Sequence, residues 1–242
     1  MKRKGAAGPD DIPPTFLKNL GPAALGRLLY IFNLSLIKSE CPQIWKNAVI
    51  IPLLKVGKPA SRLDSFRPIS LTSCVVKAME RMLAERLFTL AENNRWFSCL
   101  QAGFRKGRSC EDQILKITQA IEDGFHRNPH KRSVLVLLDF SKAYDTVWRE
   151  KLLGSMIEKG VPTYITNWLH GFLRNRMASV HFNGTLSSWR QFKQGLPQGS
   201  VLSPILFLFY INNLADLLPT TTTNAMYADD VAILATDKSR VV

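Results

Sequence analysis

The sequence predicts an α+β fold, in which a mainly helical first part is followed by a part that mixes strands and helices. Before residue 133, apolar side chains recur at three- and four-residue spacing over residues 23–37 and 75–91. From residue 133 onward, short apolar runs of strand length alternate with helical patterns. These two observations predict two subdomains with a boundary near residue 133.

Three helices and one strand are predicted before this boundary. Residues 23–37 are rich in Leu, Ile and Phe at mixed spacing, which favours a buried helix, and residues 75–91 place their apolar side chains on one stripe. A third helix is expected after Ser109, because Ser109-x-x-Asp112 resembles a capping box that precedes an apolar face. Residues 49–54 form a β-branched run, which predicts a short strand.

Strands and helices alternate after the boundary. Residues 133–138 form a continuous apolar run, which is typical of a strand covered on both faces. The elements expected next are two helices and two strands, at 149–159, 163–175, 178–182 and 189–192. Asn183-Gly184 lies between the two strands and is a strong hairpin signal.

The last part of the chain begins with a loop, 195–199, that leads into a predicted helix over 201–218. This helix is apolar nearly all round, so we expect it to be central and buried. Residues 225–227 and 231–235 predict two short strands joined by Ala228-Asp229-Asp230.

The composition is that of a globular protein, with 46% hydrophobic and 21% charged residues among 242. A basic start, Met1 to Lys4, is followed by Gly, Pro and Asp instead of the apolar run of a signal peptide. The densest apolar stretch, 205–211, is too short to span a membrane. We therefore expect an intracellular protein of the nucleus or cytoplasm, neither secreted nor membrane-bound.

The cysteines and histidines form no metal-binding pattern. The four cysteines are scattered and include no Cys-x-x-Cys pair, so neither a disulfide framework nor a zinc site is indicated. His126 and His130 are four residues apart, but Pro129 lies between them and would break a helix that aligned them as ligands. A metal role for this pair is disfavoured.

Positive charge is concentrated in the first part of the chain. The formal net charge is +13, and residues 1–110 contain 18 basic against 7 acidic side chains. Such an excess suits a surface that follows a polyphosphate backbone. A basic face that is merely solvated is the alternative, and charge alone does not separate the two.

Three aspartates stand where apolar strands end. Asp139 follows the run 133–138, and Asp229 and Asp230 join the two last strands. Taken singly, Asp139 is better explained as a strand-end residue and the Asp-Asp pair as a solvated turn. Together they indicate a metal site, because neighbouring carboxylates repel one another and Mg²⁺ prefers hard oxygen ligands. Two such ions can stabilise both oxygens of an in-line phosphoryl transfer.

Six motifs, in the same order, resemble those of reverse transcriptases from retrotransposons without long terminal repeats, especially the jockey-like elements. Three are typical of reverse transcriptases in general: Leu138-Asp-Phe-Ser-Lys-Ala-Tyr-Asp145, Gly195-Leu-Pro-Gln-Gly-Ser-Val-Leu-Ser-Pro204 and Tyr227-Ala-Asp-Asp230. Three more resemble the N-terminal motifs of this group: Gly8-Pro-Asp-Asp-Ile-Pro13, Phe66-Arg-Pro-Ile-Ser-Leu71 and Gln101-Ala-Gly-Phe-Arg-Lys-Gly-Arg-Ser109. The resemblance covers residues 5 to 236.

The resemblance implies the chemistry of the carboxylates. Asp139, Asp229 and Asp230 would hold two Mg²⁺ ions, with the backbone carbonyl of Phe140 as a further ligand and Mn²⁺ as a possible substitute. Tyr144 would be the steric gate that excludes a ribose 2′-hydroxyl. From the sequence alone, a core tyrosine explains Tyr144 equally well.

The resemblance also implies how the other substrates are held. Lys55 and Arg67 would clamp the triphosphate of a dNTP, with Lys58 as an alternative to Lys55. Gln198 and Gly199 would lie against the new base pair. Two more cations, Arg105 and Arg108, are either contacts to template phosphates or solvated loop residues.

We therefore expect the fingers (1–133) and a partial palm (134–242) of a right-hand polymerase, with an antiparallel palm sheet packed on helices. A segment at about 154–193 would fold back toward the fingers, and a thumb would be absent. The expected function is RNA-directed DNA synthesis on an RNA template with a DNA primer.

Two alternative functions are consistent with parts of the sequence. A catalytically incomplete fragment that acts at most as an RNA-binding module remains open, because the sequence stops soon after Asp230. An RNA polymerase with a similar palm is disfavoured, because a small residue would be expected at Tyr144.

Overall fold

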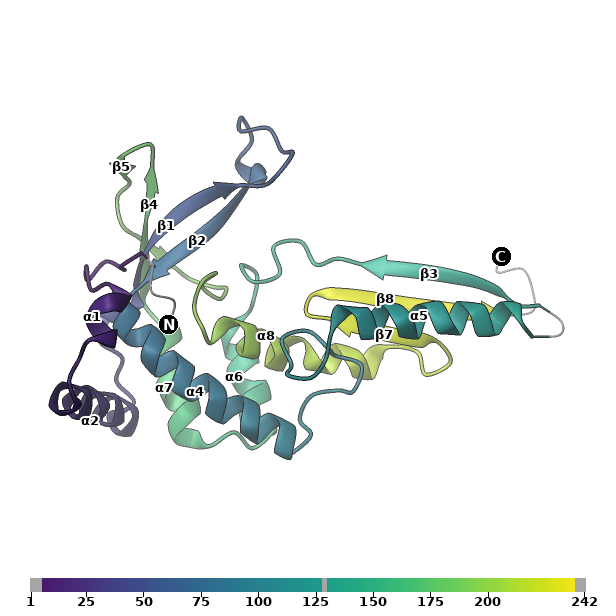
Figure 1. Cartoon of the computed structure of the whole chain (residues 1–242), viewed down its shortest axis with the longest axis horizontal. Coiled ribbons are helices and arrows are strands. Elements are labelled where there is room, and N and C mark those ends of the chain that lie inside the picture. The colour runs from purple at the N-terminus through teal and green to yellow at the C-terminus, as the bar shows by residue number, and fades with distance from the viewer. Residues whose placement is uncertain (1–5, 128–129, 238–242) are drawn as a thin grey trace. The chain divides into compact units, whose positions relative to one another are not determined.

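The computed structural model describes residues 6–127 and 130–237. The chain divides into two compact units, each made from two separate stretches of sequence. Unit 1 comprises residues 1–90 and 144–203, and unit 2 comprises residues 91–143 and 204–242 (Figure 1). The expected division into fingers and palm at residue 133 is a functional assignment and stays a prediction.

Unit 1 is built on a sheet with the strand order β2-β1-β4-β5, in which β6 also pairs with β4. The strands are β1 (Asn47–Leu54), β2 (Phe66–Thr72), β4 (Arg176–Phe182), β5 (Thr185–Leu186) and β6 (Arg190–Phe192). β1 and β2 are antiparallel, whereas β1 and β4 are parallel. The parallel pairing brings the segment after Tyr144 into one sheet with the N-terminal segment.

The helices of unit 1 are α1 (Pro14–Lys18), α2 (Pro22–Lys38), α3 (Gln43–Lys46), α6 (Arg149–Glu158) and α7 (Thr163–Leu173). Residues 74–90 of α4 (Cys74–Asn93) also belong to unit 1. The 3₁₀ helix η1 (Leu63–Ser65) precedes β2. α7 forms the centre of the core: Trp168 and Phe172 are fully buried, and their rings stack at 5.1 Å.

Unit 2 contains a three-stranded antiparallel sheet with the order β3-β8-β7. Its elements are α5 (Cys110–Phe125), β3 (Arg132–Leu138), α8 (Ser203–Ile211), η2 (Asn212–Leu217), β7 (Thr223–Tyr227) and β8 (Asp230–Asp237). α5 runs along the sheet (Figure 1), and Ile117 packs on Ala225 and Leu234. The expected α+β class, with an antiparallel sheet packed on helices, is confirmed.

Several local predictions are confirmed. Ser109 and Asp112 form the expected capping box at the start of α5. Asn183 and Gly184 both have positive φ angles, of 48° and 78°, and form the predicted hairpin turn, although it joins β4 to the short β5 and the predicted strand at 189–192 pairs with β4 separately as β6. The apolar segment after the loop is buried as expected, although the α-helix ends at Ile211 and continues as the 3₁₀ helix η2.

The prediction that residues 23–37 form a buried helix is correct about the helix and wrong about its burial. α2 exists, but only Phe32 and Ser35 are buried. Ser35 accepts a hydrogen bond from the Trp168 indole on α7, and Phe32 packs edge-on against Trp45. The helix meets the core along one narrow side, so most of its Leu and Ile side chains face solvent.

The prediction that residues 133–138 form a strand covered on both faces is also wrong. β3 is an edge strand, and its residues Val134 to Leu138 are between 41% and 71% exposed. α5 packs more closely on β7 than on β3. A continuous apolar run therefore marks a strand here without marking its position in the sheet.

Apolar helices occur in both units. Within the described ranges, every helix is too short or too polar to cross a bilayer.

Candidate active site

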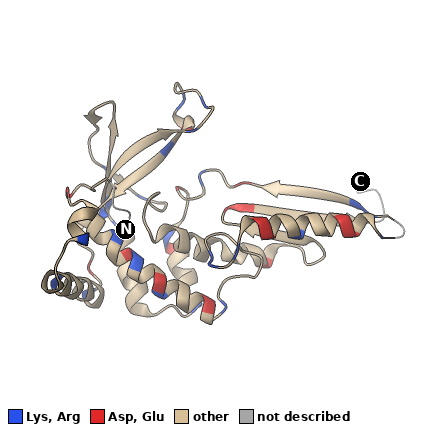
Figure 2. Ribbon diagram, viewed as in Figure 1, with Lys and Arg blue, Asp and Glu red and all other residues tan. Residues whose placement is uncertain are grey.

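The three predicted carboxylates lie at one end of the unit 2 sheet. Leu138 pairs with Val231 and Tyr227 pairs with Asp230, so Asp139 leaves β3 beside the turn that carries Asp229 and Asp230. Figure 2 shows acidic residues, coloured red, in this turn at the start of β8. Sheet register, and not proximity in sequence, brings Asp139 to the Asp-Asp pair.

The turn that carries this pair is fixed by Gln101, a residue of the motif 101–109 for which no role was predicted. Its side-chain oxygen accepts hydrogen bonds from the Ala228 and Gly103 amides, both at 2.8 Å. Its side-chain nitrogen donates to the Ala228 carbonyl at 3.1 Å. Gln101 is only 1% exposed, so this network acts in a dry environment, where hydrogen bonds hold geometry well.

Partial burial and neighbouring negative charges both affect the acid–base behaviour of the turn. The pKa of Asp230 is raised, first by partial desolvation and then by the negative charges of Asp229 and Asp139. A group of anionic oxygens that repel one another is the donor set that suits a divalent cation. In the described part of the chain, however, no three ligating side chains converge closely enough to hold an ion as they stand.

The five residues predicted to hold the nucleotide all belong to unit 1, whereas the aspartates and Phe140 belong to unit 2. Within unit 1, the loop 195–200 is bonded to the segment around Tyr144. The Leu196 amide donates to the Tyr144 carbonyl at 2.7 Å, and the Gln198 side chain donates to Asp145 at 3.0 Å. The structure thus brings together Tyr144, Gln198 and Gly199.

The two predicted phosphate clamps lie apart from this loop in sequence and differ in their contacts. Arg67 is an exposed residue of β2. The Lys55 ammonium group donates to the Asp64 carbonyl at 2.9 Å and so closes the loop that follows β1. Lys58 is exposed in the same loop. Arg67 is therefore the cation whose side chain is more accessible to a ligand.

Gly199 is required by its surroundings. Its φ angle is +119°, and a Cβ atom would lie 2.7 Å from the Ser70 carbonyl oxygen. Replacement of Gly199 by alanine is expected to destabilise the protein by about 2 kcal/mol or more, because both the backbone angle and the contact are unfavourable. Urea unfolding measures this loss. Gly154→Ala, in α6 with open space around it, should be neutral or stabilising; equal unfolding midpoints for both variants would contradict this account.

The interpretation of Arg105 as a template contact is corrected by the structure. Its side chain is buried and forms two hydrogen bonds to the Glu92 carboxylate, at 2.7 and 2.8 Å. It also donates to the Ser98 and Gln101 carbonyls and lies over the Phe97 ring. Arg105 therefore holds unit 2 together, whereas Arg108 is exposed.

Loss of Arg105 is expected to cost stability and not RNA binding. Arg105→Ala should lower the free energy of unfolding by about 2–3 kcal/mol, because it leaves buried carbonyls and a carboxylate without their donor. The Arg105 hydrogen bond lowers the pKa of Glu92 below its ordinary 4.5. The stabilisation is therefore present above pH 4.5 and is lost as the pH falls through the lowered value.

Urea titrations at pH 7 measure the effect, with Arg108→Ala as the control from the same loop. Ordinary surface substitutions change the free energy of unfolding by less than about 0.5 kcal/mol. A change no larger than this for Arg105→Ala would show that the buried contacts are not stabilising.

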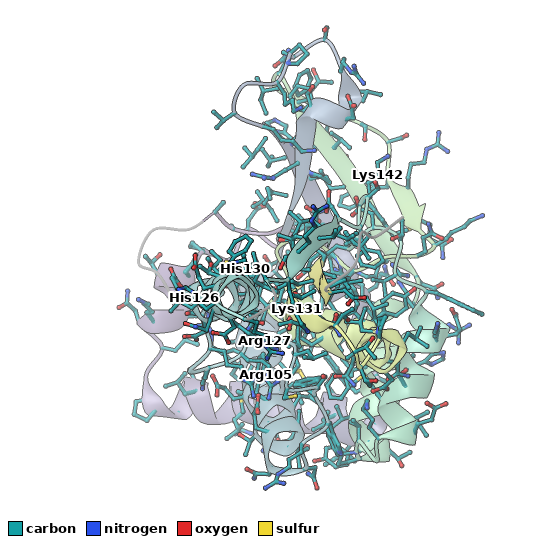
Figure 3. All side chains as sticks on the ribbon, turned by 90° about the vertical axis from the view of Figure 1, so that its right-hand side faces the viewer. Arg105, His126, Arg127, His130, Lys131 and Lys142 are labelled. Atoms are coloured by element: carbon teal, nitrogen blue, oxygen red, sulfur yellow. The ribbon has the colours of Figure 1, made fainter. Side chains whose placement is uncertain are left out.

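His126 and His130 bond to separate backbone carbonyls at the end of α5 (Figure 3). The Nδ1 atom of His126 donates to Glu122, and that of His130 donates to Phe125. The Nδ1 atoms of both imidazoles are thus occupied by backbone carbonyls near the end of α5.

The fold and the carboxylates define a class of protein. An antiparallel sheet packed on helices, with three aspartates at one end of its strands, is the arrangement expected of the palm of a template-directed polymerase.

Comparison with known proteins identifies the family within this class. Residues 55–242 match the model of the reverse transcriptase (RNA-dependent DNA polymerase) family. The chain therefore belongs to the reverse transcriptase family.

Curated relatives place the resemblance among mobile elements. The chain is 34% identical over 239 residues to a probable RNA-directed DNA polymerase from transposon BS of Drosophila melanogaster. It is 31% identical over 242 residues to the RNA-directed DNA polymerase from mobile element jockey of the same species. These matches cover 96% and 98% of the chain but 26% of each relative. The expected likeness to jockey-like elements is confirmed, and the chain spans about a quarter of their length.

Solved structures show the same fold at low sequence identity. Telomerase from Candida tropicalis, in complex with a fragment of telomeric RNA, matches 90% of this chain with a TM-score of 0.59 and 13% identity. The match covers 40% of that protein.

Proposed function

We propose that this chain is the polymerase core of a reverse transcriptase that copies RNA into DNA. The 3′-hydroxyl of a DNA primer attacks the α-phosphate of a dNTP, and pyrophosphate leaves. The observation that carries the proposal is the placement of Asp139, Asp229 and Asp230 at one end of a single sheet. The names and functions of the relatives support it.

The carboxylates of Asp139, Asp229 and Asp230 are the proposed ligands of two Mg²⁺ ions, with the Phe140 carbonyl as a further donor. Mn²⁺ would suit the same oxygen donors. Bound ions supply a Lewis acid that stabilises charge on the attacking and leaving oxygens. The protein contributes rigidity, because Gln101 fixes the Ala228 turn before any ligand arrives.

Unit 1 is proposed to select and hold the nucleotide. Arg67 suits bidentate contact with phosphate oxygens, and Lys55 or Lys58 adds a second positive charge. The Tyr144 ring excludes a 2′-hydroxyl, and Gln198 with Gly199 forms the surface against the new base pair. In this proposal residues 1–133 act as fingers and residues 134–242 as a partial palm.

The proposed partners are an RNA template and a DNA primer, and the proposed location is the nucleus or cytoplasm. The net charge of +13 supports binding to a polyanion. A telomerase of similar fold was solved with RNA, which supports RNA as the template.

Primer extension on an RNA template tests the function. The chain is assayed as it stands and also joined to the segment that follows the matching region in the jockey polymerase. Incorporation of the complementary dNTP is expected with Mg²⁺ or Mn²⁺ and not after chelation with EDTA. RNA binding without incorporation by either protein, with either ion, would leave the binding module as the correct function.

A further inference from the structure

Glu80 is a buried carboxylate that the nucleotide-binding residues do not include. It lies in α4 on the same stripe as Val76, Leu83 and Leu87, and its exposure is 0%. It takes part in none of the ion pairs found among the described residues. Burial raises the pKa of Glu80, against the opposing effects of a Ser200 hydrogen bond and the Arg176 charge. A buried carboxylate is costly unless its oxygens are hydrogen-bonded.

The compensation is made at one of the two oxygens, by the end of the loop that carries Gln198 and Gly199, whereas Oε1 is buried without a hydrogen-bond partner in the described part of the chain. One Glu80 oxygen accepts from the Ser200 hydroxyl at 2.5 Å and from the Val201 and Leu202 amides at 2.6 and 3.2 Å. These amides immediately precede α8, where helix N-termini leave amide groups without backbone partners. The carboxylate therefore satisfies donors that would otherwise be buried and unpaired.

The other side of the loop is held by β2. The Ser70 amide donates to the Gln198 carbonyl at 2.7 Å, and Gly199 lies directly against the Ser70 carbonyl. Arg67 is three residues away on the same strand. The pair Gln198-Gly199 is thus clamped between Ser70 on one side and the Glu80 bonds on the other.

We propose that Glu80 is a positioning residue for nucleotide selection, which acts by holding residues 200–202 and thereby Gln198 and Gly199. This inference rests on the proposed function. Glu80 does not touch substrate. It fixes the loop in the position that contacts the new base pair, where displacements on the order of 1 Å are enough to weaken catalysis strongly.

Three substitutions separate this role from general stability. Glu80→Leu keeps the approximate size but removes every acceptor, and it should raise the KM for the correct dNTP about tenfold, equivalent to ~1.4 kcal/mol. Its kcat should fall less than its KM rises. Glu80→Gln keeps one acceptor oxygen and should recover most of the affinity. Glu85→Gln, on the exposed side of α4, is the matched control and should leave both constants unchanged.

Misincorporation should increase in Glu80→Leu, since a loosely held loop discriminates less between base pairs. A properly folded Glu80→Leu protein with an unchanged KM and error rate would overturn the proposal. So would losses in Glu80→Leu and Glu80→Gln that simply follow their melting temperatures. If Glu80→Leu does not fold, Ser200→Ala decides: the proposal expects a smaller rise in KM, about threefold for one lost hydrogen bond, and an unchanged KM contradicts it.

Amide hydrogen exchange separates failure of this inference from failure of the proposed function. Exchange at Val201 and Leu202 should accelerate in Glu80→Leu and not in Glu85→Gln. Unchanged exchange contradicts the positioning role whether or not the protein is active. Absence of incorporation by both the chain and its extended form contradicts the proposed function, and the exchange result for Glu80 still holds.

Discussion

Replacement of Asp230 by asparagine is expected to reduce templated nucleotide incorporation by at least about a thousandfold, which is ~4 kcal/mol in the activation barrier. Asparagine keeps the shape of the side chain but removes the negative charge that attracts a divalent cation. The substitution should not destabilise the fold. Asp230 is exposed as a residue, and partial desolvation, followed by the charges of Asp229 and Asp139, raises its pKa and disfavours its ionised form.

The contrast between activity and stability makes this prediction specific. Single-nucleotide incorporation measures the activity of the Asp230→Asn variant. Its stability is measured by urea unfolding, which should give an unchanged or slightly higher midpoint. Asp237→Asn, at the other end of β8, is the control and should remain active. Equal activities of the Asp230 and Asp237 variants would remove the turn from the catalytic site.

Replacement of Tyr144 by alanine is expected to admit ribonucleotides. Without the ring, discrimination between dNTP and rNTP should fall by about tenfold or more, ~1.4 kcal/mol, because steric exclusion of the 2′-hydroxyl is lost. The backbone of this residue should stay in place, since its carbonyl accepts the Leu196 amide. Competition between the two nucleotides for one template base measures the ratio.

Two variants make the Tyr144 result interpretable. Tyr144→Phe keeps the ring and should keep the discrimination, so it separates the ring from the hydroxyl. Tyr164→Ala, on the exposed side of α7, repeats the chemical change elsewhere in unit 1 and should have no effect. If Tyr144→Ala discriminates as well as the parent, Tyr144 is a packing residue and not the gate.

Local sequence signals predicted most elements of the fold. The capping box at Ser109 and the Asn183-Gly184 hairpin depend on residues a few positions apart, so they can be identified without tertiary information. Burial was harder to predict. α2 and β3 are both strongly apolar, yet one meets the core along a narrow side and the other lies at a sheet edge. Which neighbours cover an apolar segment is decided by topology.

The candidate site likewise combines features that local sequence predicts with features that depend on the tertiary structure. The three aspartates were predicted from strand ends and motifs, and sheet register places them at one end. Local sequence left two interpretations of Arg105 open, a template contact and a solvated loop residue, and the structure shows neither because the guanidinium is buried against Glu92. Glu80 had one visible signal, an acidic residue on the apolar stripe of α4. Its partners lie about 120 positions away, beyond the reach of local reasoning.

The central claim is that Asp139, Asp229 and Asp230 hold the ions for RNA-directed DNA synthesis. Incorporation of one templated dNTP, measured together with RNA affinity, tests it in the parent and in a variant with all three aspartates changed to asparagine. Both proteins should bind RNA equally well or the variant slightly better, and only the parent should add the nucleotide. Equal incorporation by the variant would contradict the claim.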